Sequence, residues 1–386
     1  MTSIEQHISA CLGELAPNVH HKEHLRHLIS HAPCIDVDHL IDRSFNEGLS
    51  SLLYKNLLQS GGLECINPAQ KERLQTLYYK TAVFNLKLIQ DLKHILRLLN
   101  QKEIQVVLLQ GIGIVQQIYH DIALRPMGDI DLWVLPKNHP SLIHILRHQG
   151  YRQDPIYAHI FRKGSTTFDI HTQILWADRI KASKLLLAKS ENNIYLNCRP
   201  LSFEGQKALC LHSCDQIIYL CLHALKHRVD KLIWLMDIKL SVDGWERADW
   251  KGLIRRAQEL GQMKTISYIF FILQLFDFKL PPEANEFFNG ENIRLWEKKI
   301  LQERIKKDSL PGWGPPLLFS STTRWRQRFY FIMETLFPRP EILRQVFAYS
   351  PSRTIFQLYW RRFAQILKMI EQQTITRQAD SIDILR

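Results

Sequence analysis

The chain has 386 residues, which is long enough for two or three structural units. With 46% hydrophobic and 23% charged residues, 16 glycines and 16 prolines, its composition excludes fibrous, low-complexity and largely disordered proteins. The formal net charge of +12 is compatible with a polyanionic partner but does not identify one.

The seven cysteines predict reduced thiols in the cytoplasm. Their number is odd and their spacing is wide, so they do not form a disulfide framework. Three of them cluster with two histidines among leucines, without a C-x-x-C spacing, which favours buried thiols over a structural zinc site. The clustered residues are Cys210, His212, Cys214, Cys221 and His223.

No segment is expected to enter a membrane. The N-terminal stretch contains Glu5 and no apolar run, which argues against a signal peptide. The most apolar stretch, residues 266–278, is interrupted by Gln274 and Asp277. It is too short to span a bilayer and is typical of a buried helix.

Residues 1–100 are expected to be helical. Apolar residues recur at helical spacing between Ile41 and Leu53. Asn67 and Pro68 then form a start signal for a longer helix that continues to Leu98.

A small α/β unit is expected over residues 101–200. Its first strand is an apolar, β-branched run that stops before Gln110. Its later strands show alternating polar and apolar residues or have turn residues at their ends. The expected elements are a strand at 104–109, a helix at 114–119, a strand at 129–135, a helix at 142–148, and strands at 157–162 and 166–175.

Helical periodicity resumes near Gly205 and is expected to continue through residues 201–386. The sequence therefore predicts an α+β fold: a small mixed-sheet core flanked by N-terminal and C-terminal helical regions.

The end of the chain is basic and aromatic. Nine basic and two acidic residues lie between Ser321 and Ile370, and aromatic and basic residues alternate in 324–330 and 359–363. We expect a solvated basic helical face with its aromatics in the core. Alternatively, such segments stack bases and neutralise phosphates, so RNA is a second candidate partner.

The strand at 129–135 carries the most informative motif. Residues two apart in a strand point to the same face, so Asp129 and Asp131 project together. Two adjacent carboxylates repel each other unless a cation lies between them, and magnesium prefers carboxylate oxygens. A D-x-D pair alone also occurs on the polar face of an ordinary edge strand.

A third carboxylate follows on a later strand, where Asp169 and His171 share a face. If this strand lies beside the D-x-D strand, Asp169 completes a three-carboxylate site that can hold two metal ions. Gly111, between a strand and a helix, either exposes backbone N–H groups to a phosphate or serves a tight turn alone.

The stretch LLQGIGIVQQIYHDIALRPMGDIDLWV resembles the motif of the uncharacterised nucleotidyltransferases, relatives of DNA polymerase beta and kanamycin nucleotidyltransferase. The similarity extends over residues 85–240 and includes LCLHALKHRVDKLIWLMDIKL. It implies a nucleotidyltransferase core that uses magnesium or manganese and an NTP such as ATP. It also implies that Asp129, Asp131 and Asp169 are catalytic metal ligands, and that Gln110, Gly111 and Arg125 contact the nucleotide.

Four further residues, His171, His223, His227 and Asp237, are candidate accessory groups. His171 either orients a ligand or is a packing residue, and Arg125 either reaches a phosphate or braces its turn. His223 and His227 share a helix face that is expected to pack near the cleft; the spacing lacks the glutamate of a zinc protease. Asp237 belongs either to this site or to a surface charge pair with Lys231 or Lys239.

Three functions remain open. The first is transfer of a nucleoside monophosphate from an NTP to a hydroxyl or similar group on a small molecule or a protein. The second uses RNA as the acceptor, docked on the basic C-terminal region. The third is a non-catalytic nucleotide- or partner-binding module, motivated by Gln110, because the family commonly has lysine there.

Overall fold

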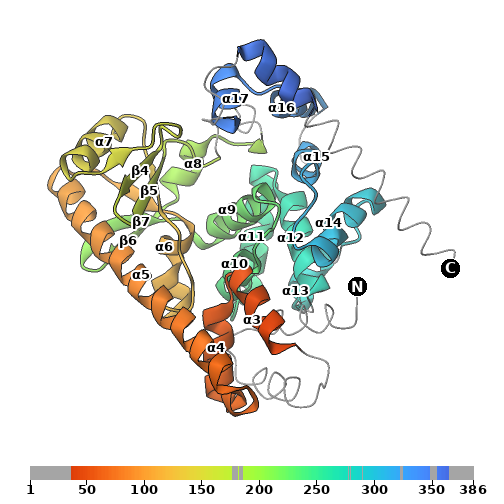
Figure 1. The fold of residues 1–386 in the computed structure, drawn as a ribbon. Coiled ribbons are helices and arrows are strands. Elements are labelled where there is room, and N and C mark those ends of the chain that lie inside the picture. The colour runs from red at the N-terminus through yellow and green to blue at the C-terminus, as the bar shows by residue number, and fades with distance from the viewer. Residues whose placement is uncertain are drawn as a thin grey trace.

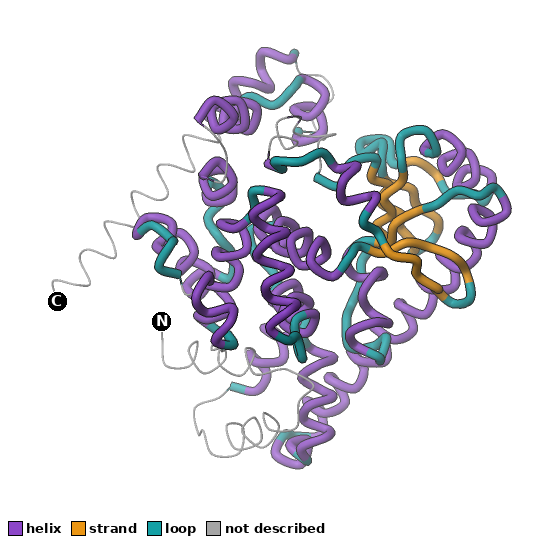
Figure 2. The backbone as a smooth tube through the Cα atoms, turned by 180° about the vertical axis from the view of Figure 1, so that it is seen from behind, coloured by secondary structure: helices purple, strands orange, loops and turns teal. Residues whose placement is uncertain are grey.

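The computed structural model describes residues 36–175, 181, 186–276, 278, 280–288, 290–321, 325–347 and 354–364. It has an α+β fold in which a seven-stranded mixed sheet lies at one end and a layer of helices at the other (Figures 1 and 2). The predicted fold class is therefore confirmed. The prediction on the signal peptide concerns residues outside the described part of the chain.

The strands follow the order β3-β4-β5-β2-β1-β7-β6 across the sheet. β2 pairs antiparallel with β1 and parallel with β5, and β1 pairs parallel with β7. The remaining neighbours are antiparallel. The strands are β1 (Val106–Leu108), β2 (Ile130–Val134), β3 (Arg152–Gln153), β4 (Ile160–Lys163), β5 (Thr166–His171), β6 (Arg199–Phe203) and β7 (Gln206–Cys210).

One face of the sheet is covered by α5 (Pro68–Gln101) and α7 (His139–His148). Ile130 and Leu132 of β2 point to that face and join the core formed with these two helices. Because side chains alternate along a strand, Asp131 and Trp133 point to the opposite face. Trp133 belongs there to a second core that includes the C-terminal helices.

The long helix α5 connects the N-terminal helices to the sheet (Figure 1). It begins at the predicted start signal: Asn67 and Gln70 form a capping box, with Pro68 at the first helical position. Midway along it, the buried Asn85 amide donates hydrogen bonds to the carbonyl oxygens of Ile122 and Arg125. The helix thus fixes the loop that precedes β2.

The remaining helices form the layer beside the sheet. α9 and α10 lie next to the sheet, α11 and α12 pack on them, and α13, α14 and α15 pack on α12. Within the described residues, no helix combines the length and apolarity needed to cross a membrane. The main helices are α3 (Val37–Asn46), α4 (Ser50–Ser60), α8 (Glu191–Leu196), α9 (Ser213–Lys226), α10 (Leu232–Ser241), α11 (Arg247–Leu260), α12 (Met263–Leu275), α13 (Pro282–Phe288), α14 (Leu295–Lys307), α15 (Gly314–Ser321), α16 (Trp325–Leu336) and α17 (Pro340–Val346).

The prediction that helix resumes near Gly205 is wrong. Glu204 and Gly205 have positive φ angles and form the turn of the β6–β7 hairpin. β7 then pairs with β1. This strand depends on a partner about a hundred residues earlier, and short apolar runs do not reveal such pairing. The short strand β3 is also absent from the sequence prediction.

The expectation that the C-terminal aromatics lie in the core is wrong for most of those described. Phe329, Tyr330, Trp360 and Phe363 are exposed, because α16 and the helix at 355–364 lie apart from the main helical layer (Figure 1). Tyr359 is half-buried, and its hydroxyl donates to the carbonyl oxygen of Pro338. The side chains of 325–328 lie outside the described part of the structure.

Candidate functional site

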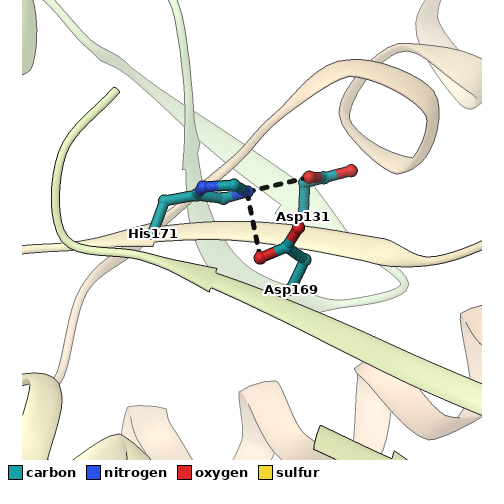
Figure 3. Close-up of side chains that lie close together, drawn as sticks. All are labelled: Asp131, Asp169 and His171. Atoms are coloured by element: carbon teal, nitrogen blue, oxygen red, sulfur yellow. Dashed lines mark hydrogen bonds and ion pairs between the residues drawn. The ribbon is translucent and has the colours of Figure 1, made fainter. Parts of the chain in front are cut away.

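Asp131 and Asp169 lie side by side on the central strands. β2 and β5 are parallel, and their register places Asp131 directly opposite Asp169. Paired residues of adjacent strands point to the same face, so both carboxylates face the helical layer. Figure 3 shows the two carboxylates converging on one histidine. The three-carboxylate site predicted from the sequence depends on Asp169 facing the same side of the sheet as Asp131, and the register places it there.

That histidine, His171, connects the two carboxylates. Its Nε2 atom lies 2.9 Å from Asp131 Oδ1 and 3.5 Å from Asp169 Oδ1. His159 Nε2, next to the start of β4, lies 3.9 Å from the same Asp169 oxygen. One ligand atom from each of Asp131, Asp169 and His171 lies within 4.8 Å of the others, which is close enough for one metal ion.

Charge repulsion among the carboxylates appears in their pKa values. The negative charge of Asp131, followed by burial and Asp169, raises the pKa of Asp129 to about 7. Burial also raises the pKa of Asp131, but hydrogen bonds from His171 and Gln110 outweigh it, so that pKa lies below its ordinary value. Asp129 precedes β2, and its side chain lies in the same pocket although it keeps contact with solvent.

The donor set fits a hard divalent cation. Asp169 Oδ1 is buried and accepts no hydrogen bond of good geometry, so a cation would satisfy it. Burial raises the pKa of Asp169, and the charge of Asp131 adds to this effect. Carboxylate oxygens are the ligands that magnesium and manganese prefer, and Asp131 and Asp169 bring two of them together. Metal binding by Asp129 stays a prediction, because the described group of candidate ligands does not include it.

Gln110 and Gly111 lie beside the carboxylates at the end of β1. The Gln110 amide donates a 2.5 Å hydrogen bond to Asp131 Oδ2, from a backbone with φ of +36°. A Cβ on Gly111 would lie 2.6 Å from Arg125 Nη1, so the glycine is needed to admit the guanidinium. The short helix α6 (Gln110–Ile114) begins here and runs into a π-helical turn, η2 (Val115–Tyr119). Phosphate contact by Gln110 and Gly111 stays a prediction.

Arg125 is held in a buried ion pair with Asp237 of α10. Its Nη2 lies 2.8 Å from Asp237 Oδ2, and its Nε donates to Oδ1 at 3.3 Å. The hydroxyl of Tyr119 donates to Asp237 Oδ1 at 2.7 Å, and Arg125 Nη1 donates to the Pro126 carbonyl oxygen. Asp237 is fully buried, so the alternative of a surface pair with Lys231 or Lys239 is wrong. Phosphate contact by Arg125 stays a prediction, while the structure shows that it anchors the turn before Asp129.

A pocket of about 700 Å³ opens in front of the carboxylates. One wall is a group of three rings: His223 and His227 lie 4.5 Å apart between centroids, and Trp234 lies 5.1 Å from His223 and 5.2 Å from His227. This arrangement confirms that the shared face of the two histidines lies at the cleft. Within the described chain, neither histidine belongs to the group of candidate metal ligands. The rings are tilted or edge-on to one another, with interplanar angles of 41°, 87° and 53°, so a ligand could stack on a single ring but not on all three together.

The sequence did not single out several pocket residues. The opposite wall comes from the N-terminal helices and α5, and includes Ser50, Lys80 and Thr81. On the ring side, Lys226 lines the pocket three residues after His223, on the same face of α9. Helical spacing from His223 is the signal that would have found Lys226.

The mixed sheet and its paired strand carboxylates agree with the resemblance to nucleotidyltransferases seen in the sequence. The chain belongs to the family described as uncharacterised nucleotidyltransferases, which matches residues 33–276. Comparisons with curated proteins and with solved structures find no match.

Proposed function

We propose that this protein transfers a nucleoside monophosphate from an NTP to a hydroxyl or similar group. The observation that carries the proposal is the parallel register of Asp131 and Asp169, both facing a pocket that Asp129 also lines. Family membership supports nucleotidyl transfer in general.

In this reaction an acceptor oxygen forms a bond to the α-phosphorus, and the bond from that phosphorus to the α,β-bridging oxygen breaks. Pyrophosphate leaves with the electron pair. Two divalent cations held by Asp129, Asp131 and Asp169 would supply charge neutralisation at the attacking and leaving oxygens. Asp169, whose pKa burial raises, would receive the acceptor proton, and His171, which lies near both carboxylates, would orient them.

We favour a small molecule or a protein side chain as the acceptor. The pocket of about 700 Å³ is enclosed by α4, α5, α9 and α10 as well as by the sheet, which suits a compact group beside a nucleotide. The cytoplasmic location and the choice of magnesium or manganese stay predictions. The part of the chain that the structure describes has no membrane-spanning helix.

A screen of purified protein tests this proposal. Each of the four NTPs, with magnesium or manganese, is examined for a rise in melting temperature and for pyrophosphate release. We expect at least one NTP to stabilise the protein and to be consumed once an acceptor is present. No binding and no turnover under any condition would contradict the proposal. A silent wild type that Gln110→Lys activates would instead support the non-catalytic alternative.

RNA is a second candidate acceptor because of the exposed aromatics at the C-terminal end. Phe329, Tyr330 and Trp360 are exposed, and arginines such as Arg361 lie among them. Such surfaces bind single-stranded RNA with a strong salt dependence. RNA binding that weakens steeply between 50 and 200 mM salt, roughly a thousandfold, would favour this acceptor. Weak binding that salt does not change would exclude it.

A further inference from the structure

Transfer from an NTP requires positive charge at the leaving pyrophosphate, and this site has few groups to supply it. A triphosphate is highly anionic, and three aspartates already line the pocket. Gln110 is neutral, and the guanidinium of Arg125 is bound to Asp237. Burial keeps the pKa of His223 well below its ordinary value, so that ring is neutral.

The face of α9 that lines the pocket carries one lysine. Tyr219, His223, Lys226 and His227 follow helical spacing and all reach the pocket. Lys226 is in the last turn of α9, where a cation is favoured by the helix dipole, and it is half-buried. Its position is thus fixed by a helix that is embedded in the core.

Lys226 lies on the ring wall of the pocket, close enough to the strand carboxylates to act on their charges. Its positive charge helps to lower the pKa of Asp131 and opposes the rise in the pKa of Asp169, and it acts on His171 as well. Charges influence one another this way over short distances in a partly buried site. Two other lysines that line the pocket, Lys80 and Lys231, are exposed at its margin.

We propose that Lys226 binds the β- and γ-phosphates of the NTP and the pyrophosphate that leaves. The inference rests on the proposed function, and it assigns to α9 the cation that Gln110 does not provide at the end of β1. As the bond between the α-phosphorus and the bridging oxygen breaks, negative charge grows on pyrophosphate, and the ammonium group of Lys226 stabilises it. The triphosphate then lies between the strand carboxylates and the last turn of α9.

The test compares ligands that differ in the phosphates they carry. Binding of inorganic pyrophosphate, α,β-methylene ATP and AMP to the full chain is measured by calorimetry with magnesium. The variants are Lys226→Met, Lys226→Arg and Lys226→Gln, and Lys239→Met is the control. Lys239 is also a half-buried lysine in the last turn of a helix, α10, but it lies outside the pocket.

We expect Lys226→Met and Lys226→Gln to weaken pyrophosphate binding about tenfold to a hundredfold, because a charged hydrogen bond is lost. Binding of the ATP analogue should weaken similarly, AMP should change less than about threefold, and Lys226→Arg should retain most affinity. Lys239→Met should match the wild type. Melting curves identify any variant that does not fold, and the Gln and Arg variants then decide the comparison.

Unchanged pyrophosphate affinity in Lys226→Met or Lys226→Gln would overturn the assignment. An equal loss for AMP and pyrophosphate would also overturn it, since Lys226 would then not distinguish the leaving phosphates. If the wild type transfers nucleotide while these variants bind normally, this inference alone falls. If the wild type binds neither pyrophosphate nor any NTP, the proposed function falls with it.

Discussion

The two walls of the pocket are built in different ways. On the sheet side, Asp131 and Asp169 project from regular strands whose pairing sets their positions. On the helical side, the ring wall depends on a turn between α9 and α10 in which Arg228 and Val229 both have positive φ. Such a backbone is costly for a β-branched residue, so other contacts must hold it.

Those contacts come from distant parts of the chain. Arg304 of α14 donates to the Val229 carbonyl oxygen and lies 2.6 Å from Glu47 Oε2. The same Glu47 oxygen accepts the first backbone N–H of α10, from Leu232, at 2.8 Å. α14 lies beyond the segment that matches the family. In the proposed function the sheet side carries the chemistry and the helical side positions the substrate, and Arg304 of α14 helps to hold the strained turn of the ring wall.

The largest expected effect is on the sheet side. Asp131→Ala should reduce turnover at least about a thousandfold, because it removes a central carboxylate. The melting temperature should fall by a few degrees, since His171 and the Gln110 amide lose the carboxylate that they contact. Pyrophosphate release measures the rate, and Asp38→Asn on the exposed face of α3 is the control. Activity within about tenfold of the wild type would contradict a catalytic role for the carboxylates on the sheet side.

The helical side should respond in stability first. Arg304→Met removes one of the two arginines that pair with the buried carboxylate of Glu47 and leaves Arg43, which should cost up to about 3–5 kcal/mol of unfolding free energy. Adding Glu47→Gln should recover part of that loss, because the buried carboxylate charge is then removed. Urea unfolding of the single and double variants measures both values. A loss of unfolding free energy below about 1 kcal/mol for Arg304→Met would show that the strained turn does not depend on Arg304.

The ring wall should affect affinity more than rate. Trp234→Ala removes the indole that contacts both histidine rings, and should raise the KM of one substrate about tenfold, a typical loss for one stacked ring. Steady-state kinetics at saturating concentrations of the other substrate separates KM from kcat. Trp296→Ala on α14 is a control with a partly exposed indole. An unchanged KM for both substrates would contradict stacking of a substrate on the Trp234 ring.

The smallest expected effect is a pH-dependent gain in stability from Asp129→Asn without metal. The folded-state pKa of Asp129 is about 7, above its ordinary value of 3.8, so the wild type loses stability as pH rises from about 4 to 7. The asparagine variant should therefore melt a few degrees higher at pH 8 and equally at pH 4. Magnesium should stabilise the wild type more than the variant, which keeps Asp131 and Asp169. Equal melting at both pH values would contradict the repulsion among the carboxylates.

The difference between the locally determined sheet side and the helical side, which depends on distant contacts, also explains what could be predicted from the sequence. Alternation along one strand is a local property, so the amino-acid sequence alone indicates Asp131 and Asp169 with the strands that carry them, and Asp129 directly before β2. The start of α5 at Asn67 could be predicted for the same reason, because a capping box involves neighbouring residues.

Long-range partners could not be predicted. Arg125 and Asp237 are 112 residues apart, and Glu47 and Arg304 are 257 apart. Nothing in the local pattern of either residue indicates its partner. Lys226 is an intermediate case. Helical spacing places it on the same face of α9 as His223, but the direction of that face depends on how α9 packs against the sheet.

The most direct test is a crystal structure with manganese and α,β-methylene ATP, in which anomalous scattering locates the metal. The account predicts a manganese peak within about 2.3 Å of carboxylate oxygens of both Asp131 and Asp169, with the nucleotide phosphates beside it. A bound nucleotide whose manganese lies away from these two carboxylates would contradict the account.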